Sequence, residues 1–144
     1  MPSASDNGQQ VTSLAAEKAI LTALSATPQV YYQPTLHLNT ANVAVTPLTP
    51  LSALVEATFT GYAAAAAIAF TGPFSGPNGS AQMFAPSITF TCTGGTPNAT
   101  VFGWYLTDST GADLYLYVPL ATPVMIANIG DGVTIQPAVQ NSGI

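Results

Sequence analysis

The feature that most constrains the fold of this chain is the way glycine and proline divide it into short segments. The 144 residues include 12 glycines and 12 prolines, and the segments after Pro28 alternate between polar and apolar residues or are short apolar runs. Ser87–Thr93 is the clearest case, since Ile88, Phe90 and Cys92 fall on one face and hydroxyl residues on the other. Short alternating segments between Gly/Pro turns are typical of antiparallel β-proteins.

About eight strands are expected on this basis, in a mainly β fold of the antiparallel β-sandwich or barrel type, jelly-roll-like in its connections. Val43–Ser52, with Pro47 and Pro50, reads as an extended loop, and Gly72–Ser80 as a long loop. Besides Ser87–Thr93, the expected strands are Thr35–Asn39, Val55–Tyr62, Ala63–Thr71, Val101–Thr107, Leu114–Val118, Val124–Ala127 and Val133–Val139.

The N-terminal part has a different texture. Residues 1–10 are polar and read as a flexible arm, and residues 11–144 as a single β domain that begins with one short α-helix. Thr12–Ser25 is rich in helix-forming residues and lacks Gly and Pro, and Thr27-Pro28 would end such a helix. The first ten residues contain no apolar stretch of the kind found in secretory signals.

Charge is scarce and one-sided. Only 5% of the residues are charged, against about 25% in an average domain. Lys18 is the single basic residue and there is no arginine, which gives a formal net charge of −5. Binding to nucleic acid or to an anionic membrane needs several Lys or Arg, so we expect neither partner. The same lack of cations predicts that contacts with a partner survive high salt, whereas strong salt sensitivity would place the relevant charges on the partner.

The residues that could carry nucleophilic chemistry are few. Cys92 and His37 are the single thiol and the single imidazole of the chain, so a Cys/His pair is formally possible. However, Cys92 shares the face of Ile88 and Phe90, which favours a buried cysteine that acts as a small apolar residue. His37 opposes Leu36 and Leu38, which favours a surface or interface histidine. No disulfide can form within the chain.

The acids also lack a pattern that selects a site. Asp108 and Asp113 flank one predicted hairpin turn, where capping of their own backbone is favoured over a weak cation site. Glu56 with Asp108 or Asp131 is a formal carboxylate pair, but nothing in the sequence selects it. We therefore predict no catalytic, cofactor-binding or metal-binding residues, and no enzyme activity.

The aromatic residues allow two interpretations. Tyr31-Tyr32, Trp104-Tyr105, Tyr115 and Tyr117 could form a platform that stacks on sugar rings. Trp104 is better explained as an inward-facing core residue, whereas Tyr115 and Tyr117 oppose an apolar stripe and are expected on an exposed or subunit-facing surface. Two glycosylation sequons, at Asn78 and Asn98, lie in predicted loops.

Three segments in order resemble a family of small phage-encoded virion proteins with the pattern EATFxGYA, then FTCTGG, then VYGWYLTD. Here they read EATFTGYA at Glu56–Ala63, FTCTGG at Phe90–Gly95 and VFGWYLTD at Val101–Asp108. With the predicted helix and the TLHL strand before them, the resemblance spans about residues 12–135. It implies a structural component of the virion, such as a capsid decoration (cement) protein or a minor head or tail protein, and no catalytic residues.

The resemblance leads to a functional hypothesis with one alternative. The first is a non-enzymatic decoration protein that bridges major capsid subunits in the virion, assembled in the host cytoplasm. Its contacts would use residues 1–10, the Val43–Ser52 loop and the tyrosine face, and the chain would form a homo-oligomer, for example a trimer. The alternative is a carbohydrate-binding or host-adhesion module of a tail fibre or baseplate.

Overall fold

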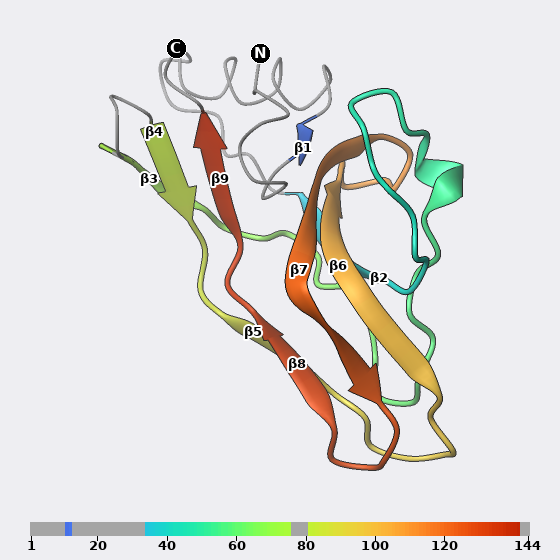
Figure 1. Cartoon of the computed structure of the whole chain (residues 1–144). Coiled ribbons are helices and arrows are strands. Elements are labelled where there is room, and N and C mark those ends of the chain that lie inside the picture. Colours follow the sequence, from blue (N-terminus) through green and yellow to red (C-terminus); the bar gives the residue numbers. More distant parts are fainter. Residues whose placement is uncertain (1–10, 13–33, 76–80, 142–144) are drawn as a thin grey trace.

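The computed structural model describes residues 11–12, 34–75 and 81–141, which form a β-protein (Figure 1). One short 3₁₀ turn, η1 (Leu51–Ala53), lies in the loop after the second strand. The strands are β1 (Val11–Thr12), β2 (Thr35–Asn39), β3 (Thr71–Ser75), β4 (Ala81–Phe84), β5 (Ile88–Thr91), β6 (Ala99–Thr107), β7 (Leu114–Ile126), β8 (Gly132–Ile135) and β9 (Ala138–Asn141).

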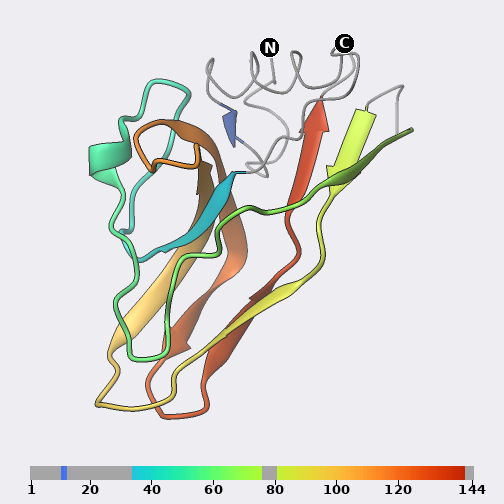
Figure 2. The same ribbon diagram turned by 180° about the vertical axis from the view of Figure 1, so that it is seen from behind.

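The strands pair in three antiparallel sheets. The largest has the order β1-β7-β6-β2, and the others have the orders β3-β4-β9 and β5-β8. The Ala85 N–H donates to the carbonyl oxygen of Pro137 at 3.0 Å, between the two smaller sheets. The chain therefore runs as one long ribbon from β4 into β5, paired with β8 and β9, beside the β6–β7 hairpin (Figure 2).

The main core is formed by residues from both the large sheet and the ribbon. Leu36, Leu106 and Leu116 lie side by side across β2, β6 and β7, and each is at most 1% exposed. Phe90 and Ile135 of the ribbon belong to the same buried cluster. Burial of such side chains supplies most of the favourable free energy of folding.

The opposite face of the large sheet is covered by the loop between β2 and β3. His37, Tyr105 and Tyr117 are partners in register across β2, β6 and β7. Tyr105 and Tyr117 form a second buried cluster with Leu54, against which Val45, Leu51 and Leu114 pack. Because β6 is covered on both faces, its sequence is a continuous apolar run instead of an alternating one.

The predicted mainly β, antiparallel fold is confirmed. The strand expected at Ser87–Thr93 is present as β5, with Phe90 and Cys92 buried and Thr89 exposed. The barrel form of the prediction is wrong for the described residues, since their strands form open sheets and no closed barrel. Thr12, where the predicted helix would begin, pairs with Leu116 in β1, and the rest of that helix lies outside the described residues.

Two predicted strands are wrong, Val55–Tyr62 and Ala63–Thr71. Both segments lie along β2 but touch it through isolated bridges, one at Glu56 and one at Ala65. The alternation in the first segment reflects the burial of Ala57 and Phe59, not a regular ladder. Isolated bridges of this kind bury alternate apolar side chains without a continuous ladder. Alternation of polar and apolar residues therefore does not require a strand.

Other boundaries differ because glycine and proline do not always end a strand. Thr71–Ser75, whose last four residues were predicted to be loop, forms β3. The strands predicted at Leu114–Val118 and Val124–Ala127 are one strand, β7, which continues through Pro119 and Pro123. The described partner of β7 opposite β6 is β1, which pairs only with Leu116 and Tyr117, so these prolines break no described ladder there. The predicted strand Val133–Val139 is interrupted between β8 and β9.

Candidate functional site

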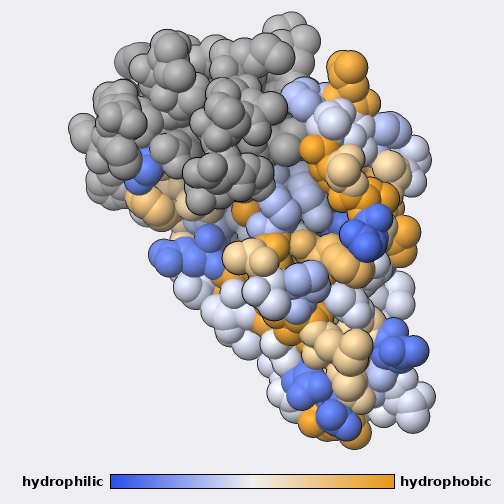
Figure 3. All heavy atoms as spheres, in the orientation of Figure 1, coloured by the Kyte–Doolittle hydropathy of each residue, from blue (hydrophilic) through white to orange (hydrophobic). Residues whose placement is uncertain are grey.

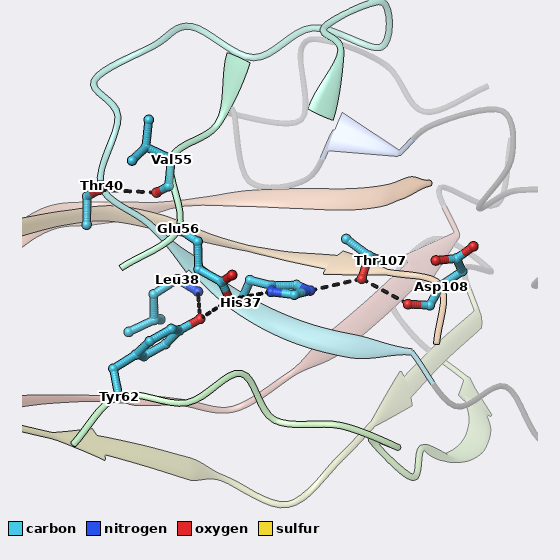
Figure 4. A network of polar contacts seen from close by, with 8 residues as sticks. All are labelled: His37, Leu38, Thr40, Val55, Glu56, Tyr62, Thr107 and Asp108. Carbon is cyan, nitrogen blue, oxygen red and sulfur yellow. Dashed lines mark hydrogen bonds and ion pairs between the residues drawn. The ribbon is translucent and has the colours of Figure 1, made fainter. Parts of the chain in front are cut away.

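The candidate site is a cluster of polar side chains centred on Glu56 (Figure 4). The carboxylate oxygen Oε2 of Glu56 lies 2.6 Å from Nδ1 of His37 and accepts a hydrogen bond from the Tyr62 hydroxyl at 2.7 Å. The Tyr62 oxygen in turn accepts the backbone N–H of Leu38 at 3.1 Å. One carboxylate thus joins β2 to two positions of the segment that runs along its edge.

The other side of the His37 ring is bound to β6. Its Nε2 lies 2.9 Å from the hydroxyl oxygen of Thr107, and that hydroxyl donates to the backbone carbonyl of Asp108 at 2.9 Å. Because the Thr107 hydrogen is used in that bond, its oxygen accepts from Nε2–H of the ring. With Nδ1 beside the Glu56 carboxylate, both ring nitrogens of His37 have a partner within the protein.

The fold brings these residues together from distant parts of the sequence. His37 stacks on Tyr105 of β6, its partner in register, with ring centroids 4.8 Å apart and an interplanar angle of 12°. The backbone bridge between Asn39 and Glu56 sets the acid beside β2. The histidine side chain is 12% exposed and the glutamate 41%, so the pair lies at the edge of a buried region.

Burial changes the ionisation of the tyrosines around this cluster. Burial first, and then the nearby Glu56 carboxylate, raise the pKa of Tyr62 far above its ordinary value of 10.0. The same two causes raise the pKa of Tyr105 to about 12. Burial also raises the pKa of Tyr117, while its hydrogen bond to Asn39 opposes the shift. All three phenols are therefore held in the neutral form.

We predict that Glu56→Ala lowers the free energy of unfolding by about 1–3 kcal/mol, since His37 and Tyr62 both lose their acceptor while partly buried. Asp113→Ala is the matched control, because Asp113 is exposed and its removal is expected to change stability by less than about 0.5 kcal/mol. Urea denaturation of both variants measures the difference. Equal losses would contradict the assigned role of Glu56.

We also predict that the protein loses stability at alkaline pH. The pKa values of Tyr62, Tyr105 and Tyr117 are raised on folding, so the folded state keeps protons that the unfolded state releases above about pH 10. This contribution is complete below pH 10 and decreases as the pH rises toward 12. Urea denaturation at increasing pH, with tyrosinate absorbance recorded in parallel, measures it; constant stability up to pH 12 would contradict it.

The structure separates the proposed Cys/His pair. Cys92 is buried in the main core and its thiol donates to the carbonyl of Gly94 at 3.3 Å, as expected for a core cysteine. His37 is on the polar side of β2, as predicted, but Glu56, Thr107 and Tyr105 leave its side chain only 12% exposed. It is therefore not an open surface residue, and the interface interpretation stays a prediction. Neighbours from distant segments cover the ring, and spacing along β2 could not reveal them.

The aspartates cap their own turns. Oδ1 of Asp108 accepts the Ala112 N–H and the Thr110 hydroxyl, which confirms the predicted capping role for Asp108. The Asp131 carboxylate accepts two backbone N–H groups of the β7–β8 turn, and these bonds lower its pKa. Burial has the largest single effect on the pKa of Asp108 and raises it, but the hydrogen bonds within its own turn together lower that pKa below its ordinary value. Neither aspartate is bonded to Glu56.

The aromatic residues agree with the predictions only in part. Trp104 is buried in the main core, as predicted. Tyr117 was predicted to be exposed or subunit-facing, and this is wrong: it is 3% exposed, in the second cluster under the loop. Tyr115 is half-buried against the main core. Asn98 is exposed just before β6, while Tyr31, Tyr32 and Asn78 lie outside the described residues.

Sequence reasoning missed the central interaction of the cluster, His37 with Glu56. Glu56 and Tyr62 are both in the EATFTGYA segment. Their spacing of six residues was the one sequence signal that these two side chains could belong to a common site. The cluster acts as a polar clasp that fixes the loop segment to β2, since both ring nitrogens of His37 and the Tyr62 hydroxyl bind protein groups. Within residues 34–75 and 81–141, no group of three or more His, Cys, Asp or Glu is placed to hold a metal ion.

No protein-family model matches the chain, and neither curated protein sequences nor solved structures contain a significant match. Among the described segments, no helix is long and apolar enough to span a membrane.

Proposed function

We propose that this chain is a non-enzymatic structural protein of a phage virion, and that it decorates the capsid by bridging neighbouring major capsid subunits. The observation that carries the proposal is the exposure of large apolar side chains at both ends of the β6–β7 hairpin (Figure 3). A bridging protein needs two separated contact surfaces, and apolar side chains are the usual anchors of such surfaces.

One contact end is the loop between β2 and β3. Leu48 is 92% exposed, and Val43 and Val55 of the same loop are also exposed. The loop packs over the end of the hairpin where β6 runs into β7 (Figures 1 and 2).

The other contact end lies where β7 leads into β8. Met125 is 61% exposed and Ile129 is 64% exposed. Between the turn beside the Leu48 loop and this end, β7 runs for 13 residues, about 40 Å of extended strand. That length suits a protein that spans a joint between two neighbours.

The segments behind the phage resemblance support a role in building the fold. The Tyr62 and Phe90 rings lie 5.5 Å apart, and Thr93 donates its backbone N–H to the carbonyl of Thr60 at 2.9 Å. Through His37, Glu56 of the first segment is also linked to Thr107 of the third. We propose that these three segments hold the sheets together in a sandwich of jelly-roll type. Their side chains then stabilise the fold and take no part in catalysis.

The carbohydrate-binding alternative receives no support from the tyrosines. It requires Tyr115 and Tyr117 on one exposed face, and Tyr117 is buried with its hydroxyl near the Asn39 amide at 3.3 Å. The tyrosine face is therefore no longer proposed as a contact surface, whereas the Val43–Ser52 loop is still proposed as one. Assembly in the host cytoplasm and a homo-oligomer, for example a trimer, belong to the same proposal.

Locating the chain in purified particles of the virus that encodes it tests this function. We expect mass spectrometry to find it in a fixed ratio to the major shell protein, and particles that lack it to open at a lower temperature. Restoring the purified chain should restore the opening temperature. Absence of the chain from mature particles would overturn the proposal.

A further inference from the structure

The Thr46–Thr49 turn presents one leucine on a rigid support. Pro47 and Leu48 occupy the two central positions of a β-turn closed by the Thr49 N–H on the Thr46 carbonyl at 3.0 Å. Proline at the first central position presets the backbone angle that this turn needs. Leu48 is thus the most exposed large apolar side chain of the described residues and stands on a preset backbone.

Side-chain hydrogen bonds strengthen the same turn. The Thr49 hydroxyl accepts the Thr46 N–H at 2.8 Å, and the Thr46 hydroxyl accepts the Leu48 N–H at 3.3 Å. The two hydroxyls lie 3.3 Å apart. Backbone and side-chain hydrogen bonds within these four residues therefore fix the conformation of the turn.

The base of the loop is also held in place. Oδ1 of the fully buried Asn39 accepts the N–H groups of Ala41 and Val55, at 2.9 and 3.1 Å, and so joins the two ends of the loop. Between them, Val45 and Leu51 pack on the cluster of Leu54, Tyr105 and Tyr117. An exposed leucine on so constrained a loop loses little conformational entropy when it is buried by a partner.

We infer that Leu48 is the anchor of a docking surface for a different protein, whose site is an apolar socket bordered by Lys or Arg. The inference deepens the proposed function and rests on it, since it describes the site on the capsid partner. The described residues carry four carboxylates, those of Glu56, Asp108, Asp113 and Asp131, and no Lys or Arg.

Charge decides between this partner and a second copy of the chain. The Asp108–Asp113 turn lies at the same end of the molecule as the Leu48 loop (Figures 1 and 2). A twofold contact places the same patch on both sides, so two copies meeting at Leu48 would bring these acids together, and the described residues offer no Lys or Arg to offset them. A socket with a basic border accommodates both the leucine and the acids.

Binding of the purified chain to particles that lack it tests the inference. We expect Leu48→Ser to weaken binding by about 10- to 100-fold, as for loss of one buried leucine, and Leu48→Met to bind nearly as well as the wild type. The fold should be unchanged, since Leu48 is 92% exposed. Asp113→Asn should slow association at low salt but leave the dissociation rate unchanged.

The outcomes separate the two proposals. If wild type binds and Leu48→Ser binds equally well, the docking inference is wrong while the decoration role stands. An unchanged association rate for Asp113→Asn would contradict the proposal that Lys or Arg border the partner's socket. If the isolated chain self-associates at working concentration and Leu48→Ser abolishes this, the occupant is a second copy and the inference is wrong. No binding of wild type overturns both proposals.

Discussion

Leu106→Ala is expected to lower the free energy of unfolding by about 3 kcal/mol, within the range of 2–5 for a leucine that leaves a cavity in a core. Leu106 is fully buried in β6, and its partners across the sheet, Leu36 and Leu116, are as well buried. Neighbours held on both sides by strand pairing cannot collapse into the space. Since a domain is stable by only about 5–15 kcal/mol, the loss is a large part of the total.

Urea denaturation followed by tryptophan fluorescence measures this loss. Trp104 is the single tryptophan of the chain and lies in the same core cluster, so its emission reports on that core. Leu48→Ala is the matched control, because the same atoms are removed from a side chain that is 92% exposed. The control should change stability by less than about 0.5 kcal/mol. Similar losses for both leucines would contradict the assignment of the core.

Gly103→Ala is expected to be about as damaging, for the opposite reason. A Cβ at this position would lie 2.6 Å from Cζ of Tyr117 and 2.7 Å from the carbonyl oxygen of Val118, and it would also meet the Tyr117 hydroxyl. Tyr117 is buried and Val118 is held in the β6–β7 ladder, so neither can move freely. Overpacking of this kind costs about 3 kcal/mol.

Gly111→Ala serves as the control for the glycine substitution. Gly111 has a φ of +78° in the exposed β6–β7 turn, and a Cβ there would meet nothing within 4 Å. The expected loss is about 1 kcal/mol, which reflects the left-handed backbone alone. The two variants are compared by thermal and urea denaturation. A loss at Gly103 no larger than at Gly111 would show that the close approach of Tyr117 does not limit this position.

The polar clasp and the two buried clusters depend on the same strand, β2. Leu36 and Leu38 face the main core, whereas His37 faces the second cluster and binds Glu56. A strand buried on both sides tolerates a polar residue only if its hydrogen bonds are made inside the protein. No buried side-chain nitrogen or oxygen of the described residues lacks a partner.

The sequence by itself determined the class of fold and the main inward-facing residues. Alternation in Ser87–Thr93 identified the buried face of β5, and turn chemistry identified the hairpin at Asp108–Gly111, because both depend on near neighbours in the chain. Through its lack of cations, the composition predicts that neither nucleic acid nor an anionic membrane is a partner, and this stays a prediction.

Only the tertiary structure decided which residues meet across long distances. His37 and Glu56 are 19 residues apart, and His37 and Thr107 are 70 apart, so no local period relates them. The burial of Tyr117 depends on the loop over β6 and β7, which alternation within β7 cannot report. Tertiary packing overrides a local pattern whenever a sheet is covered on both faces.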